Sequence, residues 1–110
     1  MSLNLRIALG CTEAIIDDDG GLKRFYHVAD ILTRYFNINF THKEDDFDTI
    51  DWTFSFRGHQ LILHYNIYTG ISLYPSKTKD ADKAENNAVA ELANSLEHKL
   101  NHDDAYRHTA

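Results

Sequence analysis

The sequence predicts an α+β fold, a two-layer sandwich in which a mostly antiparallel sheet of about five strands carries two helices on one face. Residues 50–74 alternate apolar and polar side chains with a period of two, which is typical of strands with one buried face. Residues 22–36 and 80–101 instead carry apolar side chains at helical spacing. With further alternating segments near residues 3–9 and 36–42, the expected order of elements is β-α-β-β-β-β-α.

The two central strands are predicted together with the turn between them. Large apolar side chains fall on even positions in residues 50–57 and on odd positions in residues 60–67. A two-residue turn at Gly58 and His59 accounts for this change, because glycine at the first central position suits a type II′ turn. This turn predicts the pairs Phe56–Leu61, Phe54–Leu63, Trp52–Tyr65 and Ile50–Ile67.

A third strand follows in the same way. If residues 68–70 form a three-residue loop with Gly70 in the left-handed region, Ile71 lies opposite Ile67 and Leu73 lies opposite Tyr65. Pro75 should end this strand, since proline has no N–H for the ladder. The result is a three-stranded antiparallel meander with one apolar face.

The sequence leaves two alternatives open in the segments before the meander. Residues 10–21 contain Ile15 and Ile16, which either extend a strand or fill the edge of the core. The helix over residues 22–36 should stop at Asn37, because asparagine tolerates the left-handed conformation. A strand to about His42 and an acidic connection over residues 43–49 follow. The first strand then pairs either beside this second strand or at the other edge of the sheet, beside the strand that ends at Tyr74.

The last helix is expected to run from about Asp80 to about Asn101. Asp82 and Glu85 have the spacing of a capping pair, although a start at Thr78 or Asp80 also fits. Its inward stripe is predicted to consist of Ala81, Ala84, Ala88, Leu92, Leu96 and Leu100, with Val89 beside it. Residues 1–101 should therefore form a single domain, and residues 102–110 a frayed C-terminal tail.

Composition narrows the range of functions. A chain of 110 residues with 43% hydrophobic residues is large and apolar enough to bury a core, which excludes global disorder. The net charge of −6 argues against nucleic acid or an anionic membrane as the partner. The single cysteine, Cys11, allows no internal disulfide. Neither a membrane span nor a signal peptide is apparent, so we expect a cytoplasmic protein.

The face of the meander that is not apolar carries the candidate site. The predicted register places His64 opposite Thr53 and Tyr74, with Asp51 and Ser55 as diagonal neighbours. A histidine beside a carboxylate and hydroxyls suits general acid–base chemistry or a polar ligand, but nothing in the sequence identifies a nucleophile or an oxyanion site. The predicted binding residues on this exposed face are Asp51, Thr53, Ile62, His64 and Tyr74.

Metal and cofactor sites are not predicted. His98 and His102 have a spacing that can hold a metal, but they point away from the leucines of the last helix, and Lys99 replaces the glutamate of the metalloprotease pattern. The acidic segments 17–19 and 44–48 lack the spacing of a calcium loop.

Because no catalytic signature is recognisable, the leading hypothesis is a non-catalytic protein–protein interaction or regulatory module. It would bind a partner protein, or associate with itself as a homodimer, through the exposed sheet face or an edge strand. The alternative is a small-molecule-binding protein or a minor enzyme that uses a polar pocket around His64, Asp51 and Tyr74.

Overall fold

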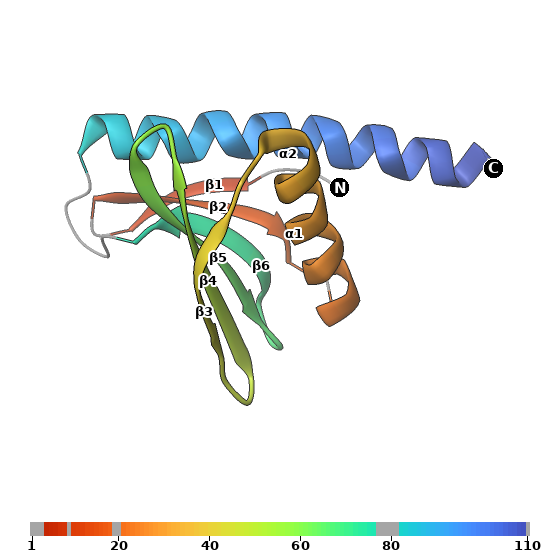
Figure 1. Cartoon of the computed structure of the whole chain (residues 1–110), viewed down its shortest axis with the longest axis horizontal. Coiled ribbons are helices and arrows are strands. Elements are labelled where there is room, and N and C mark those ends of the chain that lie inside the picture. Colours follow the sequence, from red (N-terminus) through yellow and green to blue (C-terminus); the bar gives the residue numbers. More distant parts are fainter. Residues whose placement is uncertain (1–3, 9, 19–20, 77–81, 110) are drawn as a thin grey trace.

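One antiparallel sheet and two helices make up the computed structural model, which describes residues 4–8, 10–18, 21–76 and 82–109 (Figure 1). The spatial order of the strands is β1-β2-β6-β5-β4-β3, and both helices lie on one face of the sheet, which confirms the predicted α+β sandwich. The elements are β1 (Asn4–Ala8), β2 (Cys11–Asp17), α1 (Leu22–Phe36), β3 (Phe40–Asp45), β4 (Thr49–Phe56), β5 (His59–Asn66), β6 (Gly70–Pro75) and α2 (Lys83–Thr109).

The N-terminal strand belongs to a hairpin. β2 occupies most of the segment whose structure the sequence left open, and it lies between β1 and β6. The first strand is therefore at neither of the two expected positions, although it does form the sheet edge on the β6 side. Ala14 and Ile16 of β2 are fully buried, and α2 packs on this strand. Leu5 and Ile7 of β1 are 47% and 76% exposed, so the described side chains of this edge strand contribute little to the core.

The predicted register of the meander is wrong by two residues. The pairs between β4 and β5 are Phe54–Leu61, Trp52–Leu63 and Ile50–Tyr65, with Phe56 opposite His59. The turn therefore consists of Arg57 and Gly58, whose φ angles of 53° and 81° are both positive, as in a type I′ turn. A shift of two residues keeps every side chain on its predicted face, so the apolar pattern alone could not distinguish the two registers.

The register between β5 and β6 also differs from the predicted one by two residues. Asn66 pairs with Gly70, so the loop consists of residues 67–69, and Ile71 lies opposite Tyr65 rather than Ile67. Gly70 has the expected positive φ, at 85°, and Pro75 is the last residue of β6. Ile67 was predicted to face the core, but it lies in the loop and is 50% exposed.

β3 begins and ends later than predicted. Residues 43–45, expected in an acidic connection, continue the strand, and the loop to β4 is confined to residues 46–48. Asp45 retains a structural role there, since it accepts a hydrogen bond from the indole N–H of Trp52 at 2.8 Å. The connection is thus a tight hairpin.

α1 fits the prediction closely, whereas α2 has the predicted cap but a different C-terminal end. α1 has the predicted bounds, and Asn37 ends it in the left-handed conformation with φ at 55°. At the start of α2, the Glu85 N–H donates to Asp82 Oδ1 at 2.8 Å and the Asp82 N–H donates to Glu85 Oε1 at 3.1 Å, which confirms the capping pair. α2 continues to Thr109, past the predicted end near Asn101.

α2 packs mainly on β2 and β6, and α1 packs on β5 and on α2. On α2, Ala84 is exposed and Ala93 is fully buried, which changes the predicted stripe; Ala81 lies outside the described residues. Asn86 joins the helix to the first hairpin, because its side chain accepts from the Thr12 N–H at 2.8 Å and donates to the Gly10 carbonyl at 3.0 Å. Within the described part of the chain, no helix is long and apolar enough to cross a membrane.

Candidate binding surface on the outer sheet face

The face of the sheet opposite the helices, called here the outer face, carries all five predicted site residues. The register aligns them in rows that run across β4, β5 and β6. Thr53, Ile62 and Tyr74 form one row. Asp51, His64 and Ser72 form the next. His64 therefore lies directly opposite Asp51 and Ser72, and its predicted partners Thr53 and Tyr74 lie opposite Ile62 instead.

Asp51 is the centre of a small hydrogen-bonded group. Its Oδ1 atom is bonded to Nδ1 of His64, and it also accepts from the Tyr74 hydroxyl at 3.5 Å. The rings of His64 and Tyr74 lie with their centroids 5.6 Å apart. The side chains of His64 and Asp51 are 19% and 35% exposed, so the pair remains accessible at the surface. These contacts fix three side chains from three neighbouring strands in one arrangement.

Tyr74 is half-buried and lies near two negatively charged side chains. Burial raises the pKa of its hydroxyl well above the ordinary value of 10.0, and the carboxylates of Asp51 and Glu13 raise it further. At neutral pH, Tyr74 therefore acts in this group as a neutral hydrogen-bond donor to Asp51 and not as a phenolate.

Two depressions flank this group. One has a volume of about 380 Å³ and is lined by Glu13, Ile15, Asp18, His64, Tyr68, Thr69 and Ser72. The other, of about 330 Å³, is lined by Glu44, Asp45, Asp46, Thr49 and Asp51. Both are open and polar, and carboxylates contribute to both, so the surface suits a partner that brings hydrogen-bond donors or positive charge.

The row Asp51–His64–Ser72 contains the residue types of a hydrolytic triad, but its geometry is incomplete. With Nδ1 bonded to Asp51, Nε2 of the ring is the nitrogen that would act on a nucleophile. Within the described part of the chain, no hydrogen bond joins His64 to Ser72, which is 8% exposed. The arrangement is therefore better suited to holding a ligand than to activating a serine.

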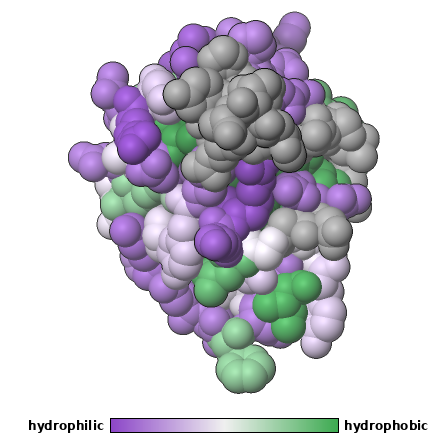
Figure 2. Space-filling model, turned by 90° about the vertical axis from the view of Figure 1, so that its right-hand side faces the viewer, coloured by the Kyte–Doolittle hydropathy of each residue, from purple (hydrophilic) through white to green (hydrophobic). Residues whose placement is uncertain are grey.

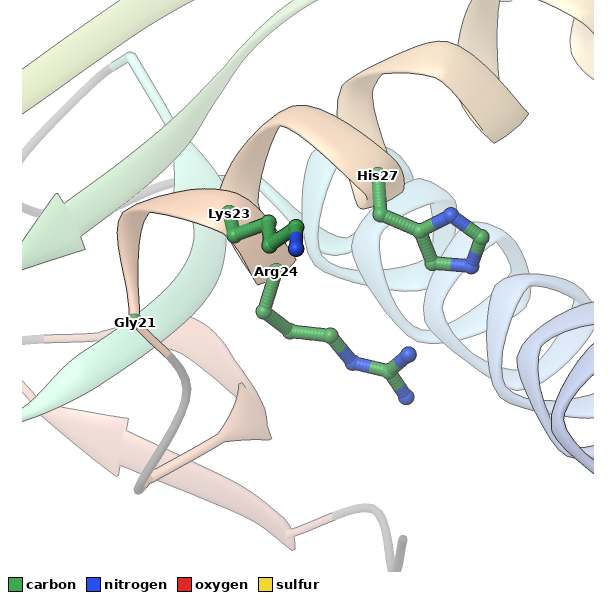
Figure 3. Close-up of a pocket in the computed structure, with 4 residues that line it drawn as sticks. All are labelled: Gly21, Lys23, Arg24 and His27. Atoms are coloured by element: carbon green, nitrogen blue, oxygen red, sulfur yellow. The ribbon is translucent and has the colours of Figure 1, made fainter.

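A third depression, of about 420 Å³, lies at the start of α1 and is lined by Gly21, Lys23, Arg24 and His27. Figure 3 shows the side chains of Lys23, Arg24 and His27 extending from the first turns of this helix. Arg24 forms an ion pair with Asp17, with 3.5 Å between Nε and Oδ2. This pair anchors the helix start to the end of β2, which gives the arginine a structural role.

Among the residues that the structure describes, no group of three or more histidine, cysteine or carboxylate side chains could hold a metal ion. His98 is exposed on α2, and the side chain of His102 lies outside the described residues. Cys11 is buried.

Sequence reasoning identified the five residues of the outer face but missed their neighbours from other strands. Glu13 and Ile15 were missed because β2 was not recognised as a strand. Glu44 and Asp46 were missed because they were placed in a solvated connection. The direct contact between Asp51 and His64 would have followed from a type I′ turn at Arg57 and Gly58.

Comparison with known proteins adds no assignment, since no family model, curated protein or solved structure matches the chain.

Proposed function

We propose that this protein is a non-catalytic protein-binding module whose outer sheet face receives a partner protein or a second copy of the chain. The observation that carries the proposal is that this face is uncovered but has an ordered group of side chains. It has no helix over it in the described structure, yet Asp51, His64 and Tyr74 are held together by hydrogen bonds and a ring contact. A preorganised surface loses little side-chain entropy when it binds.

The composition of the face supports the same function. Around the hydrogen-bonded group lie the half-buried apolar side chains of Ile62 and Ile15. The described positions of the outer face on β4, β5 and β6 carry no lysine, a residue that is depleted at interfaces, whereas tyrosine is enriched there. Self-association through this face would give a symmetric dimer. The single, buried cysteine is consistent with action in the cytoplasm.

Charge substitution on the outer face tests this proposal. Ile62→Lys and Tyr74→Lys place a cation in the middle of the outer face and should disrupt an apolar contact there, and circular dichroism checks that both variants keep the fold. We expect wild-type protein to show at least one interaction, by light scattering or by affinity capture, that both variants lose. Tyr35→Ser, which changes a 54% exposed aromatic residue on α1, should retain it. If no interaction distinguishes wild type from the two lysine variants, the outer face is not the binding surface.

A second function is favoured by one specific observation, the 380 Å³ depression beside His64. We propose as the alternative that it binds a small polar ligand, with Nε2 of His64 as the directing group. A fragment screen by NMR should then shift resonances of His64 and Ser72, and His64→Ala should abolish these shifts. Fragments that perturb wild type and His64→Ala equally would contradict this alternative.

A further inference from the structure

Three apolar side chains project from one end of the sheet without contributing to the core. Phe47 is 99% exposed, Tyr68 is 80% exposed and Ile67 is 50% exposed. They come from two loops, residues 46–48 between β3 and β4 and residues 67–69 between β5 and β6. We call these three side chains the loop-tip patch. Figure 2 shows hydrophobic surface at the lower end of the molecule, where these loops lie in Figure 1.

The two loops are held side by side in a fixed conformation. The N–H of Ile67 donates to the carbonyl of Asp48 at 3.2 Å, which joins one loop to the other. A side chain at the start of each turn also holds its backbone: the Phe47 N–H donates to Asp46 Oδ1 at 2.8 Å, and the Tyr68 N–H donates to Asn66 Oδ1 at 2.8 Å. The patch is therefore presented by ordered turns.

The apolar surface of Phe47 is not buried when the isolated chain folds, so a partner that covers it would gain the hydrophobic contribution of that burial. A group of exposed apolar side chains with a polar rim is the usual surface of a binding site. The patch is also continuous with the outer face, because Tyr68 and Thr69 line the same depression as His64.

The charge around the patch indicates the chemistry of the partner. Glu44, Asp45 and Asp46 are exposed beside it and line the acidic depression that reaches Asp51. The lysine next to them, Lys43, lies over the ring of Trp52 at 4.2 Å from its centroid. A second copy of this chain, with a net charge of −6, would bring one acidic rim against another.

We propose that the loop-tip patch docks a segment of a different protein in which apolar side chains alternate with lysine or arginine. The apolar side chains of that segment contact Phe47, Ile67 and Tyr68, and its cations contact the carboxylates of Glu44, Asp45 and Asp46. This inference rests on the proposed protein-binding function and adds the chemical class of the partner. The carboxylates around the patch would repel an anionic membrane surface.

The test uses the full chain as bait for a displayed library of random short peptides. We expect the selected peptides to combine lysine or arginine with aromatic or branched apolar residues. For a synthetic copy of a selected peptide, Phe47→Ser and Tyr68→Ser should each raise Kd by about tenfold. The double variant Glu44→Gln with Asp46→Asn should weaken binding and reduce its dependence on salt.

Matched controls separate this surface from general effects. Tyr35→Ser removes another exposed aromatic side chain, and Asp30→Asn removes another exposed carboxylate, both from α1. Both should bind the peptide as wild type does. Circular dichroism should show an unchanged fold for Phe47→Ser, because that side chain is almost fully exposed.

The outcomes distinguish this inference from the proposed function. Selected peptides without cationic residues, or with equal affinity for wild type and the Phe47→Ser and Tyr68→Ser variants, would overturn the inference. If those peptides instead lose binding to Ile62→Lys and Tyr74→Lys, the outer face still binds protein and the inference alone fails. Cationic peptides that depend on the loop-tip patch but not on Ile62 or Tyr74 would support the inference and locate the binding surface at the tip alone.

Discussion

Two glycines of the meander have nearly the same positive φ angle but very different surroundings. Gly58, with φ at 81°, lies in the β4–β5 turn, and Gly70, with φ at 85°, begins β6. A Cβ atom added at Gly58 would meet nothing within 4 Å. The same atom at Gly70 would lie 2.1 Å from the carbonyl oxygen of Asp17 and 2.8 Å from backbone atoms of Asp18. Gly58→Ala and Gly70→Ala therefore separate conformational strain from close backbone approach.

The magnitudes follow from these contacts. Both alanine variants place an L-residue in the left-handed region, which costs about 1 kcal/mol. At Gly70, the end of β2 must also move until the contact of 2.1 Å reaches at least 3.0 Å. Overpacking of this kind costs about 1–3 kcal/mol, so we expect a total loss of about 3 kcal/mol for Gly70→Ala and about 1 kcal/mol for Gly58→Ala. For a domain of this size the corresponding losses in Tm are about 15 °C and about 5 °C.

Urea and thermal unfolding measure both variants. Trp52, the one tryptophan of the chain, is 8% exposed and provides the fluorescence signal, with far-ultraviolet circular dichroism as a second probe. Equal losses for the two variants would refute the reasoning, because they would show that the approach of β2 to Gly70 costs nothing. A larger loss for Gly58→Ala would refute it more strongly.

Three further predictions address the cap, the titration and the turn. Asp82→Ala should lower the free energy of unfolding by about 1 kcal/mol, and Asp82→Asn should restore most of it; identical urea midpoints for Asp82→Ala and wild type would contradict the cap. Because the folded-state pKa of Tyr74 lies above its ordinary value of 10.0, its contribution to stability is complete below that pH and is lost as pH rises above it. The free energy of unfolding should therefore fall more steeply above this pH in wild type than in Tyr74→Phe, and equal slopes for the two proteins would contradict this. Asp51→Asn should lower the Tyr74 pKa in an ultraviolet titration. Arg57→Asn creates the preferred sequence of a type I′ turn and should raise stability by about 0.5 kcal/mol, whereas Glu91→Gln, which removes the exposed ion-pair partner of Arg57, should change it little. A loss for Arg57→Asn greater than that for Glu91→Gln would count against the turn assignment.

The face of each meander strand was predictable, but its register was not. A side-chain period of two is unchanged by a shift of two residues, so only the turn could decide between the registers. Gly58 fits either the first central position of a type II′ turn or the second of a type I′ turn. The second choice requires Arg57 at a positive φ, which arginine seldom adopts. The local sequence therefore favoured a turn at Gly58 and His59, whereas the pairing of the whole sheet places the turn at Arg57 and Gly58.

The helices were predictable because their signals are local. The apolar stripe of α1, and Asn37 as its stop, fix its bounds within one segment of chain. β2 lacked such a signal, since Ile15 and Ile16 interrupt the alternation, and Ile15 faces outward beside Ser72. The candidate site was predictable as a set of residues on one face. The depressions beside it were not predictable, because Glu13 comes from a strand placed by long-range pairing with β6, and Asp46 comes from a loop that is shorter than expected.

The contact between Asn86 and the first hairpin has a consequence for the order of folding. Strands β3 to β6 pair with their neighbours in the sequence, so this meander can form through short loops. The β1–β2 hairpin joins it only by pairing with β6, and α2 covers that junction while Asn86 bonds to Gly10 and Thr12 across the length of the chain. Closing so long a loop is slow, and until it closes β6 is an unpaired edge. During synthesis this edge of β6 stays open until β2 pairs with it, and α2, which follows β6 in the chain, then covers the junction.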